Sequence, residues 1–110
     1  MAYDAELADR IRETLDGEPA LTEKKMFGGV AFLVGGNMAV AASGQGGLML
    51  RADPADSDAL TSHERVSRMV MRGREMDGWL RVDIEALARD TDLHRWVHTG
   101  LDYARSLPAK

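Results

Sequence analysis

The sequence predicts an α+β fold in which helices pack as one layer on an antiparallel β-sheet, giving two layers. Apolar residues follow a helical spacing at both ends of the chain, whereas the middle holds short apolar runs separated by glycines. A short helical segment divides these runs, which gives the order α-β(3-4)-α-β(2)-α. With 110 residues the chain has the length of one compact domain, and we expect residues 1–110 to form a single domain.

The first expected element is a helix over residues 4–16. Asp4 is a residue type that caps helix N-termini, and Gly17 suits the left-handed conformation that often ends a helix. Between them the chain is apolar at every fourth position, at Leu7, Ile11 and Leu15. This period places one apolar stripe of the helix against a core.

The following segments predict a meander of three or four antiparallel strands. Val30–Val34 and Met38–Ala42 are apolar runs joined by Gly35-Gly36-Asn37, whose residues tolerate the positive φ angles of a hairpin turn. Ser43–Gly47 predicts a second turn, and Leu48–Arg51 predicts another short strand. Two more strands are expected at Met69–Arg72 and Gly78–Val82, with Asp77 and Gly78 in the loop between them.

Helices are expected between and after these last strands. Asp53 and Pro54 are typical of a capped first turn, which predicts a short helix over residues 54–61. A further helix begins at Asp83 and reaches about Arg89, and a last helix covers residues 92–107. The apolar residues of this last helix recur at amphipathic spacing, at Leu93, Trp96, Val97, Leu101, Ala104 and Leu107.

Composition narrows the classes of protein that remain. The chain has no cysteine, so it contains neither a disulfide nor a thiolate nucleophile nor a cysteine-based zinc site. Its first twenty residues are acidic rather than basic and apolar, and no run reaches the roughly 18 apolar residues of a membrane-spanning helix. We therefore expect a soluble, cytoplasmic protein without a signal peptide or a membrane contact.

Strand alternation divides the expected sheet into two faces. The first face is an evident core, made of Val30, Phe32, Val34, Met38, Val40, Leu48, Leu50, Leu80 and Val82. The second face holds Ala31, Leu33, Ala39, Ala41, Met49, Trp79 and Arg81. This second face is too apolar for comfortable exposure and too small for a second core, which predicts a partner or homodimer surface. The alternative is that the terminal helices cover both sides of the sheet.

Arginines concentrate in the middle of the chain. The stretch Arg65–Arg81 holds Arg68, Arg72 and Arg74, which predict a strip that meets an anionic partner. The alternative is that these charges edge a strand pair and discourage aggregation. The net charge of −4 does not favour nucleic-acid binding by the chain on its own, because such binding depends on phosphate neutralisation.

Other patterns that resemble chemical sites have simpler explanations. Gly28-Gly29 and the glycines of Ser43–Gly47 precede apolar strand sequence rather than a helix, so they indicate turns and not phosphate cradles. His94, His98 and Asp102 share one stripe of the last helix, but that stripe points away from the apolar one and is expected to be solvated. We therefore predict no catalytic, cofactor or metal site, and no enzyme.

Five ordered segments carry a family resemblance that runs over nearly the whole chain. They are Glu23-Lys24-Lys25-Met26-Phe27-Gly28-Gly29-Val30-Ala31-Phe32, Gly36-Asn37-Met38, Leu48-Met49-Leu50-Arg51, Gly73-Arg74-Glu75-Met76-Asp77-Gly78-Trp79, and the ending from Trp96-Val97 to Leu107-Pro108. The chain resembles the N-terminal domain of the TfoX/Sxy family. The resemblance implies an α-β-β-β-α-β-β-α type two-layer domain, similar to secretion-chaperone-like folds.

The resemblance also implies a regulatory context. Longer members of the family join this domain to a C-terminal one and activate natural competence genes together with a cyclic-AMP receptor protein. For this chain we expect the N-terminal domain alone, as a stand-alone member. Within its family motif we expect structural roles for Lys25, Met26, Phe27, Gly28 and Gly29, with Phe27 anchoring a strand and the glycines making a turn.

Three classes of function remain open from the sequence. The first is a non-enzymatic regulatory or adaptor domain that acts through protein contact, with a link to transcription or competence regulation implied by the resemblance. The second is a weak nucleic-acid-binding module that uses the Arg65–Arg81 strip. The third is a small-molecule-binding domain.

Overall fold

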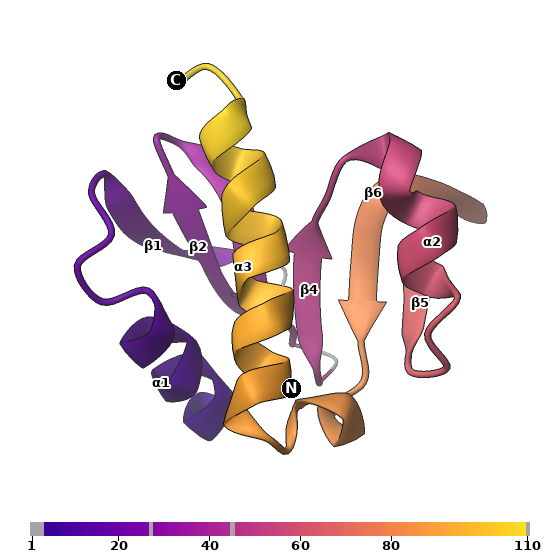
Figure 1. The fold of residues 1–110 in the computed structure, drawn as a ribbon, viewed down its shortest axis with the longest axis horizontal. Helices are drawn as coiled ribbons and strands as arrows, with labels where there is room; N and C mark the ends of the chain where they lie inside the picture. The colour runs from indigo at the N-terminus through magenta and orange to yellow at the C-terminus, as the bar shows by residue number, and fades with distance from the viewer. Residues whose placement is uncertain (1–3, 27, 45, 110) are drawn as a thin grey trace.

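In the computed structural model, which describes residues 4–26, 28–44 and 46–109, helices cover one face of an antiparallel sheet (Figure 1). This arrangement confirms the expected α+β fold with helices packed on a sheet. The strands are β1 Leu21–Met26, β2 Gly29–Val34, β3 Asn37–Ala42, β4 Leu48–Arg51, β5 Val66–Met71 and β6 Arg74–Val82. The helices are α1 Ala5–Thr14, α2 Ser57–Thr61 and α3 Asp90–Ser106, with 3₁₀ turns η1 Pro54–Asp56 and η2 Ile84–Leu87. None of the described helices is both long and apolar enough to cross a membrane.

The sheet has the strand order β1-β2-β3-β4-β6-β5, and every neighbouring pair is antiparallel. The order is thus a meander whose last two strands are exchanged. β1 is a strand that strand patterning did not predict. Its sequence Leu-Thr-Glu-Lys-Lys-Met is mostly exposed and charged, which is normal for an edge strand but hides the alternation used to recognise buried ones.

The hairpin of β5 and β6 differs from the expected one. The turn lies at Arg72-Gly73, whose φ angles are 55° and 77°, and not at Asp77-Gly78. Asp77 and Gly78 instead lie within β6, where the pairing shifts so that Arg68 faces Leu80 while Met69 faces Met76. Gly78 has a φ of 80°, and a side chain there would approach the carbonyl oxygen of Ala52 to 2.8 Å.

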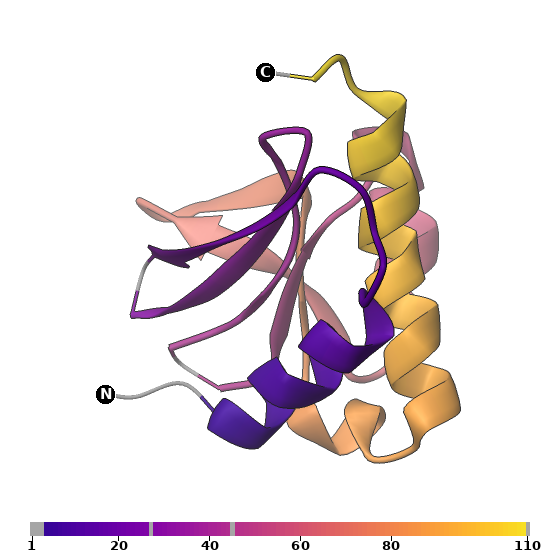
Figure 2. The same cartoon turned by 90° about the vertical axis from the view of Figure 1, so that its left-hand side faces the viewer.

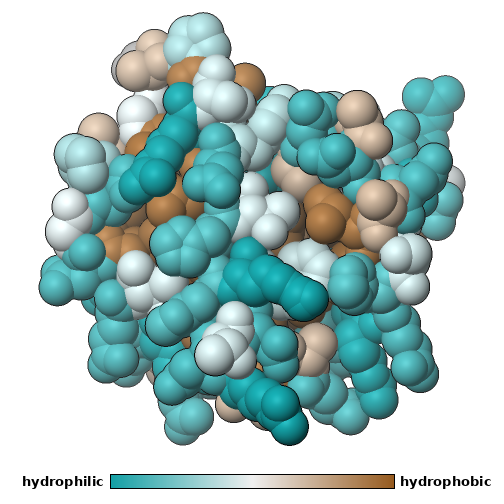
Figure 3. All heavy atoms as spheres, viewed as in Figure 1, coloured by the Kyte–Doolittle hydropathy of each residue, from teal (hydrophilic) through white to brown (hydrophobic). Residues whose placement is uncertain are grey.

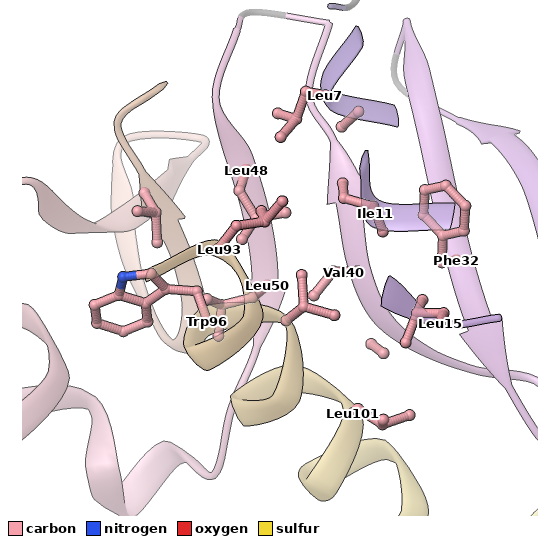
Figure 4. Close-up of a cluster of buried hydrophobic side chains, with 14 of the residues drawn as sticks. Leu7, Ile11, Leu15, Phe32, Val40, Leu48, Leu50, Leu93, Trp96 and Leu101 are labelled. Carbon is pink, nitrogen blue, oxygen red and sulfur yellow. The ribbon is translucent and has the colours of Figure 1, made fainter. Parts of the chain in front are cut away.

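The core lies between the sheet and the two long helices. Asp4 accepts a hydrogen bond from the Leu7 amide and starts α1, which confirms the expected cap. Leu7, Ile11 and Leu15 then pack beside α3 on the sheet (Figure 4). All of the predicted core face except Met38 is buried in this cluster, from Val30 and Phe32 to Leu80 and Val82. The layer of helices therefore covers one side of the sheet.

A β-bulge in β3 corrects the predicted division of the two faces. Phe32 pairs with Val40 but Leu33 pairs with Met38, so Ala39 is an extra residue. Ala39 is fully buried in the core under α3 instead of lying on the second face, and Met38 lies on that second face instead of in the core. Strand alternation was wrong at these two residues because it assumes an unbroken ladder.

Candidate functional site

The face of the sheet opposite the helices carries most of the methionines. Met26, Met38, Met49 and Met69 form a cluster there with Ala31, Leu33, Ala41 and Trp79. Met76 pairs with Met69, and Met71 lies two residues beyond Met69 on the same strand, so both point to this side as well. Six of the seven methionines of the chain thus share one face; the seventh, Met1, is outside the described residues. We call this surface the methionine face.

The methionine face is hollowed into a groove of about 330 Å³. One wall is Met26 at the end of β1, the other is Ser67–Val70 of β5, and Ala41 and Met49 lie in the floor. β1 and β5 are the two opposite edges of the sheet, so the sheet curls until both edges border one groove. Figure 2 shows the β1–β2 and β5–β6 hairpins extending on the side away from α3.

The residues predicted for a partner surface lie on this face, with one exception. Leu33, Trp79 and Arg81 are half-buried and reach its surface, whereas Ala41 and Met49 are buried in its floor. Ala39 is the exception, because the bulge turns it into the core. The surface that a partner would meet is therefore richer in methionine than strand alternation predicted.

Charged side chains on the methionine face are basic. Lys24 pairs with Ala31 in the ladder and Arg74 pairs with Met71, which places both on this side of the sheet. Arg81 lines the groove and donates a hydrogen bond from Nη2 to the carbonyl oxygen of Gly46 over 3.0 Å. At the rim, the guanidinium of Arg51 lies 5.1 Å from the ring centre of Trp79. Of the two arginines among the described groove-lining residues, Arg81 lies on the methionine face, whereas Arg68 is paired with Asp58 and Asp77; this lining contains no carboxylate.

The predicted strip of Arg68, Arg72 and Arg74 is not one surface. Arg68 lies on the helix side and binds Asp58 over 2.5 Å and Asp77 over 2.8 Å. The hydrogen bonds that Arg68 donates to Asp58 and, to a lesser extent, to Asp77 raise the pKa of Arg68 above its usual value. Arg72 forms the hairpin turn, and Arg74 lies on the methionine face. The charge of Arg68 is already compensated within the chain, and the binding of an anionic partner by this strip stays a prediction.

The family motif around Lys25 lies at the first hairpin. Lys25 is exposed on β1, and Met26 reaches the groove. Gly28 has a φ of 77°, as a turn requires, but Gly29 is needed for a different reason. A side chain on Gly29 would come within 2.0 Å of the carbonyl oxygen of Ala42 on β3. The expected anchoring role of Phe27 concerns a residue outside those that the structure describes.

The other sequence patterns do not converge on the groove. His94, His98 and Asp102 are exposed along α3, which confirms the expected solvated stripe. Among residues 4–26, 28–44 and 46–109, no three His, Asp or Glu side chains gather closely enough to hold a metal ion. Sequence reasoning missed the clustering of the methionines. They are scattered over five strands, and only the pairing of those strands brings them together.

Comparisons with known proteins agree with the fold and with the motifs. A model of the TfoX N-terminal domain matches residues 13–104, which is most of the chain. A search of curated proteins found no match, and a search of solved structures found none either. The likeness to secretion-chaperone folds therefore stays a prediction. The match covers all six strands of the described sheet and nearly all of α3, and the chain belongs to the TfoX N-terminal domain family.

Proposed function

We propose that this chain is a non-enzymatic, cytoplasmic adaptor domain that binds another protein through its methionine face. The resemblance to TfoX/Sxy regulators adds a link to transcription or competence regulation. The observation that carries the proposal is the gathering of six methionines on the side of the sheet that the helices leave uncovered. Methionine is flexible and polarisable, and it is frequent on protein surfaces that adapt to partners.

The opposite side of the molecule offers a weaker candidate. Viewed over α3, the surface is mostly hydrophilic with small separate apolar areas (Figure 3). Its charges are largely matched within the chain, since Arg12 binds Asp9 and Glu23, and Arg105 binds Glu18. The larger apolar surface therefore favours the methionine face as the contact surface.

The proposal is tested by comparing the proteins that wild type and variants retain from native cytosol. Met69→Glu places a charge on the wall of the groove, and His98→Glu places the same charge on exposed α3. Met71→Glu is a second groove-side variant at a residue that is 45% exposed, so it keeps the test valid if Met69→Glu is poorly folded. Melting curves check that each variant is folded.

The proposal predicts a protein that wild type and His98→Glu retain, and that folded groove-side variants lose. Equal retention by all variants, or loss only with His98→Glu, would show that the contact lies elsewhere. Failure of wild type to retain any protein would count against an adaptor role.

A further inference from the structure

The two edges of the sheet are built differently. β1 carries Thr22, Glu23, Lys24 and Lys25 in succession, and all four are exposed. Charges of this kind discourage the pairing of an edge strand with another chain. β5 has the sequence Val-Ser-Arg-Met-Val-Met, and its one charge, on Arg68, is tied to Asp58 and Asp77. β1 is therefore protected by a run of charges, whereas β5 is not.

The outer end of β5 is also unusually apolar for an exposed strand. Val70 is 64% exposed and Met71 is 45% exposed, and these are two of the three large hydrophobic residues that the described chain leaves most open. In the described sheet, β6 is the only strand hydrogen-bonded to β5. On the outer side of β5 the Val66 amide donates to the carbonyl oxygen of His63, and beyond it the backbone groups face outward as a template for another strand.

The groove adjoins that edge directly. Four consecutive residues of β5, Ser67–Val70, line it. Because β5 is the outermost strand of the sheet, the groove that these residues line lies directly beside that edge. If a peptide strand paired with the outer edge of β5, every second side chain of that strand would point over Met69 and the floor of the groove.

The basic residues of the methionine face favour an acidic partner. Lys24, Arg74 and Arg81 lie on the methionine face, and the described lining holds no carboxylate. These cations attract a segment that carries acidic residues. A second copy of this chain carries the same exposed basic residues, Lys24 and Arg74, on this face, so the charges of two such faces would repel each other. Stacking of nucleic-acid bases is also disfavoured, since Trp79 is the one aromatic residue among the described members of the cluster.

We infer that the partner of the methionine face is an extended acidic segment of another protein, which adds as a strand to the outer edge of β5 and places apolar side chains in the groove. This inference rests on the proposed function and specifies its partner. Backbone hydrogen bonds to β5 supply affinity, methionines receive the apolar side chains, and the basic residues select acidic sequence.

The inference is tested with the intact chain labelled with ¹³C at the methionine methyl groups. The methyl signals of Met26, Met49, Met69 and Met71 are assigned by single Met→Leu variants and followed by NMR. The probe is a ten-residue peptide of alternating leucine and glutamate. Its matched controls are the same peptide with lysine for glutamate, and the leucine-glutamate peptide N-methylated at every residue, which removes the backbone donors.

We expect the acidic peptide to shift the methyl signals of the groove, and to bind at least about tenfold more tightly than either control, which corresponds to about 1.4 kcal/mol. Its affinity falls as salt is raised, since charge attraction is screened. Equal or tighter binding of the lysine peptide would refute the acidic partner, and equal binding of the N-methylated peptide would refute strand addition.

Two further measurements test whether nucleic acid or a second copy of the chain occupies the groove instead. If a single-stranded thymidine oligonucleotide shifts the same signals at low salt, the groove binds nucleic acid and the inference is wrong. If the signals shift on dilution of the chain alone, the groove is occupied by a second copy. A different outcome is that Met69→Glu loses a cytosolic protein that wild type retains, while the acidic peptide does not bind wild type. In that case the proposed function stands and only the inference is overturned.

Discussion

Ser57 shows how one side chain positions the surface around Trp79. Its hydroxyl is buried and accepts a hydrogen bond from the Gly78 amide over 2.7 Å. The carbonyl oxygen of Gly78 in turn accepts from the Ala52 amide over 2.8 Å. The irregular part of β6 is therefore held from both sides, and the next residue, Trp79, is fixed on the methionine face.

Replacing Ser57 by alanine removes this acceptor. Because the Gly78 amide would stay buried without a partner, we expect Ser57→Ala to lower the free energy of unfolding by about 1–3 kcal/mol. Urea denaturation measures the change. Ser62→Ala, which removes an exposed hydroxyl that donates to Ala59, is the matched control and should stay within about 0.5 kcal/mol. Equal effects of the two variants would contradict the role of Ser57.

The pair of Arg12 and Glu23 fastens α1 to β1. Two hydrogen bonds, of 2.6 Å and 2.7 Å, join the guanidinium to the carboxylate. The hydrogen bond from Arg12 is the main cause that lowers the pKa of Glu23 below its usual value. Both side chains are more than a third exposed, so water screens the pair and its effect on stability is small.

The lowered pKa of Glu23 fixes the sign of a pH effect. A carboxyl whose pKa falls on folding adds stability that is fully present above its unfolded value, about 4.3, and is lost as the pH falls through the folded value. We therefore expect Glu23→Gln to be less stable than wild type at pH 7, and the difference to vanish as the pH falls below about 4. Thermal melting over pH 3–7 checks this. A difference that grows in acid would contradict it.

At the scale of elements, the close contact of α3 with β3 depends on Gly100. A side chain on Gly100 would lie 2.3 Å from the carbonyl oxygen of Ala39 and 2.9 Å from the side chain of Val40. The glycine sits in the middle of a helix, where it costs about 1 kcal/mol relative to alanine. The helix tolerates this cost because the bulge brings the backbone of Ala39 against it.

Gly100→Ala measures which of these effects is larger. Helix propensity alone predicts a gain of about 1 kcal/mol, whereas overlap with the β3 backbone predicts a larger loss. We expect a net destabilisation of about 1–3 kcal/mol by urea denaturation. His98→Ala, at an exposed position of the same helix, should change stability by less than about 0.5 kcal/mol. A stabilised Gly100→Ala would disprove the close packing.

Elements with a regular period were predictable from sequence, and irregular ones were not. The stripe of Leu7, Ile11 and Leu15 and the alternation in β2 and β4 place their residues correctly, because packing against the core repeats with the backbone. The bulge at Ala39 and the shift at Gly78 depend on a neighbouring strand, which is distant in sequence. Half of the candidate site was therefore recognised, while Met38 and Ala39 were exchanged.

For the whole molecule, the main feature is a sheet that is covered on one face and open on the other. The helices α1 and α3 seal the core side. On the other side the two edge strands curl around a groove whose floor is buried and whose walls are accessible. Under the proposed function, a binding partner would complete the packing over the methionines on this open face.

The asymmetry predicts an order of methionine oxidation. Met71 is 45% exposed, whereas Met49 and Met38 are 6% and 7% exposed. Susceptibility follows exposure, so mild peroxide should convert Met71 to the sulfoxide several times faster than either floor residue. Mass spectrometry of proteolytic peptides measures the rates. Equal oxidation rates for Met49 and Met71 would show that the groove floor is more exposed than it is in the structure.

The most direct test of the central claim is site-specific photo-crosslinking in living cells. A benzophenone amino acid is placed at Met71, beside the groove, and in a second variant at His98, on the far side of the molecule. The account predicts a protein adduct from position 71 and none from position 98. An adduct from position 98 alone, or from neither position, would contradict a binding role for the methionine face.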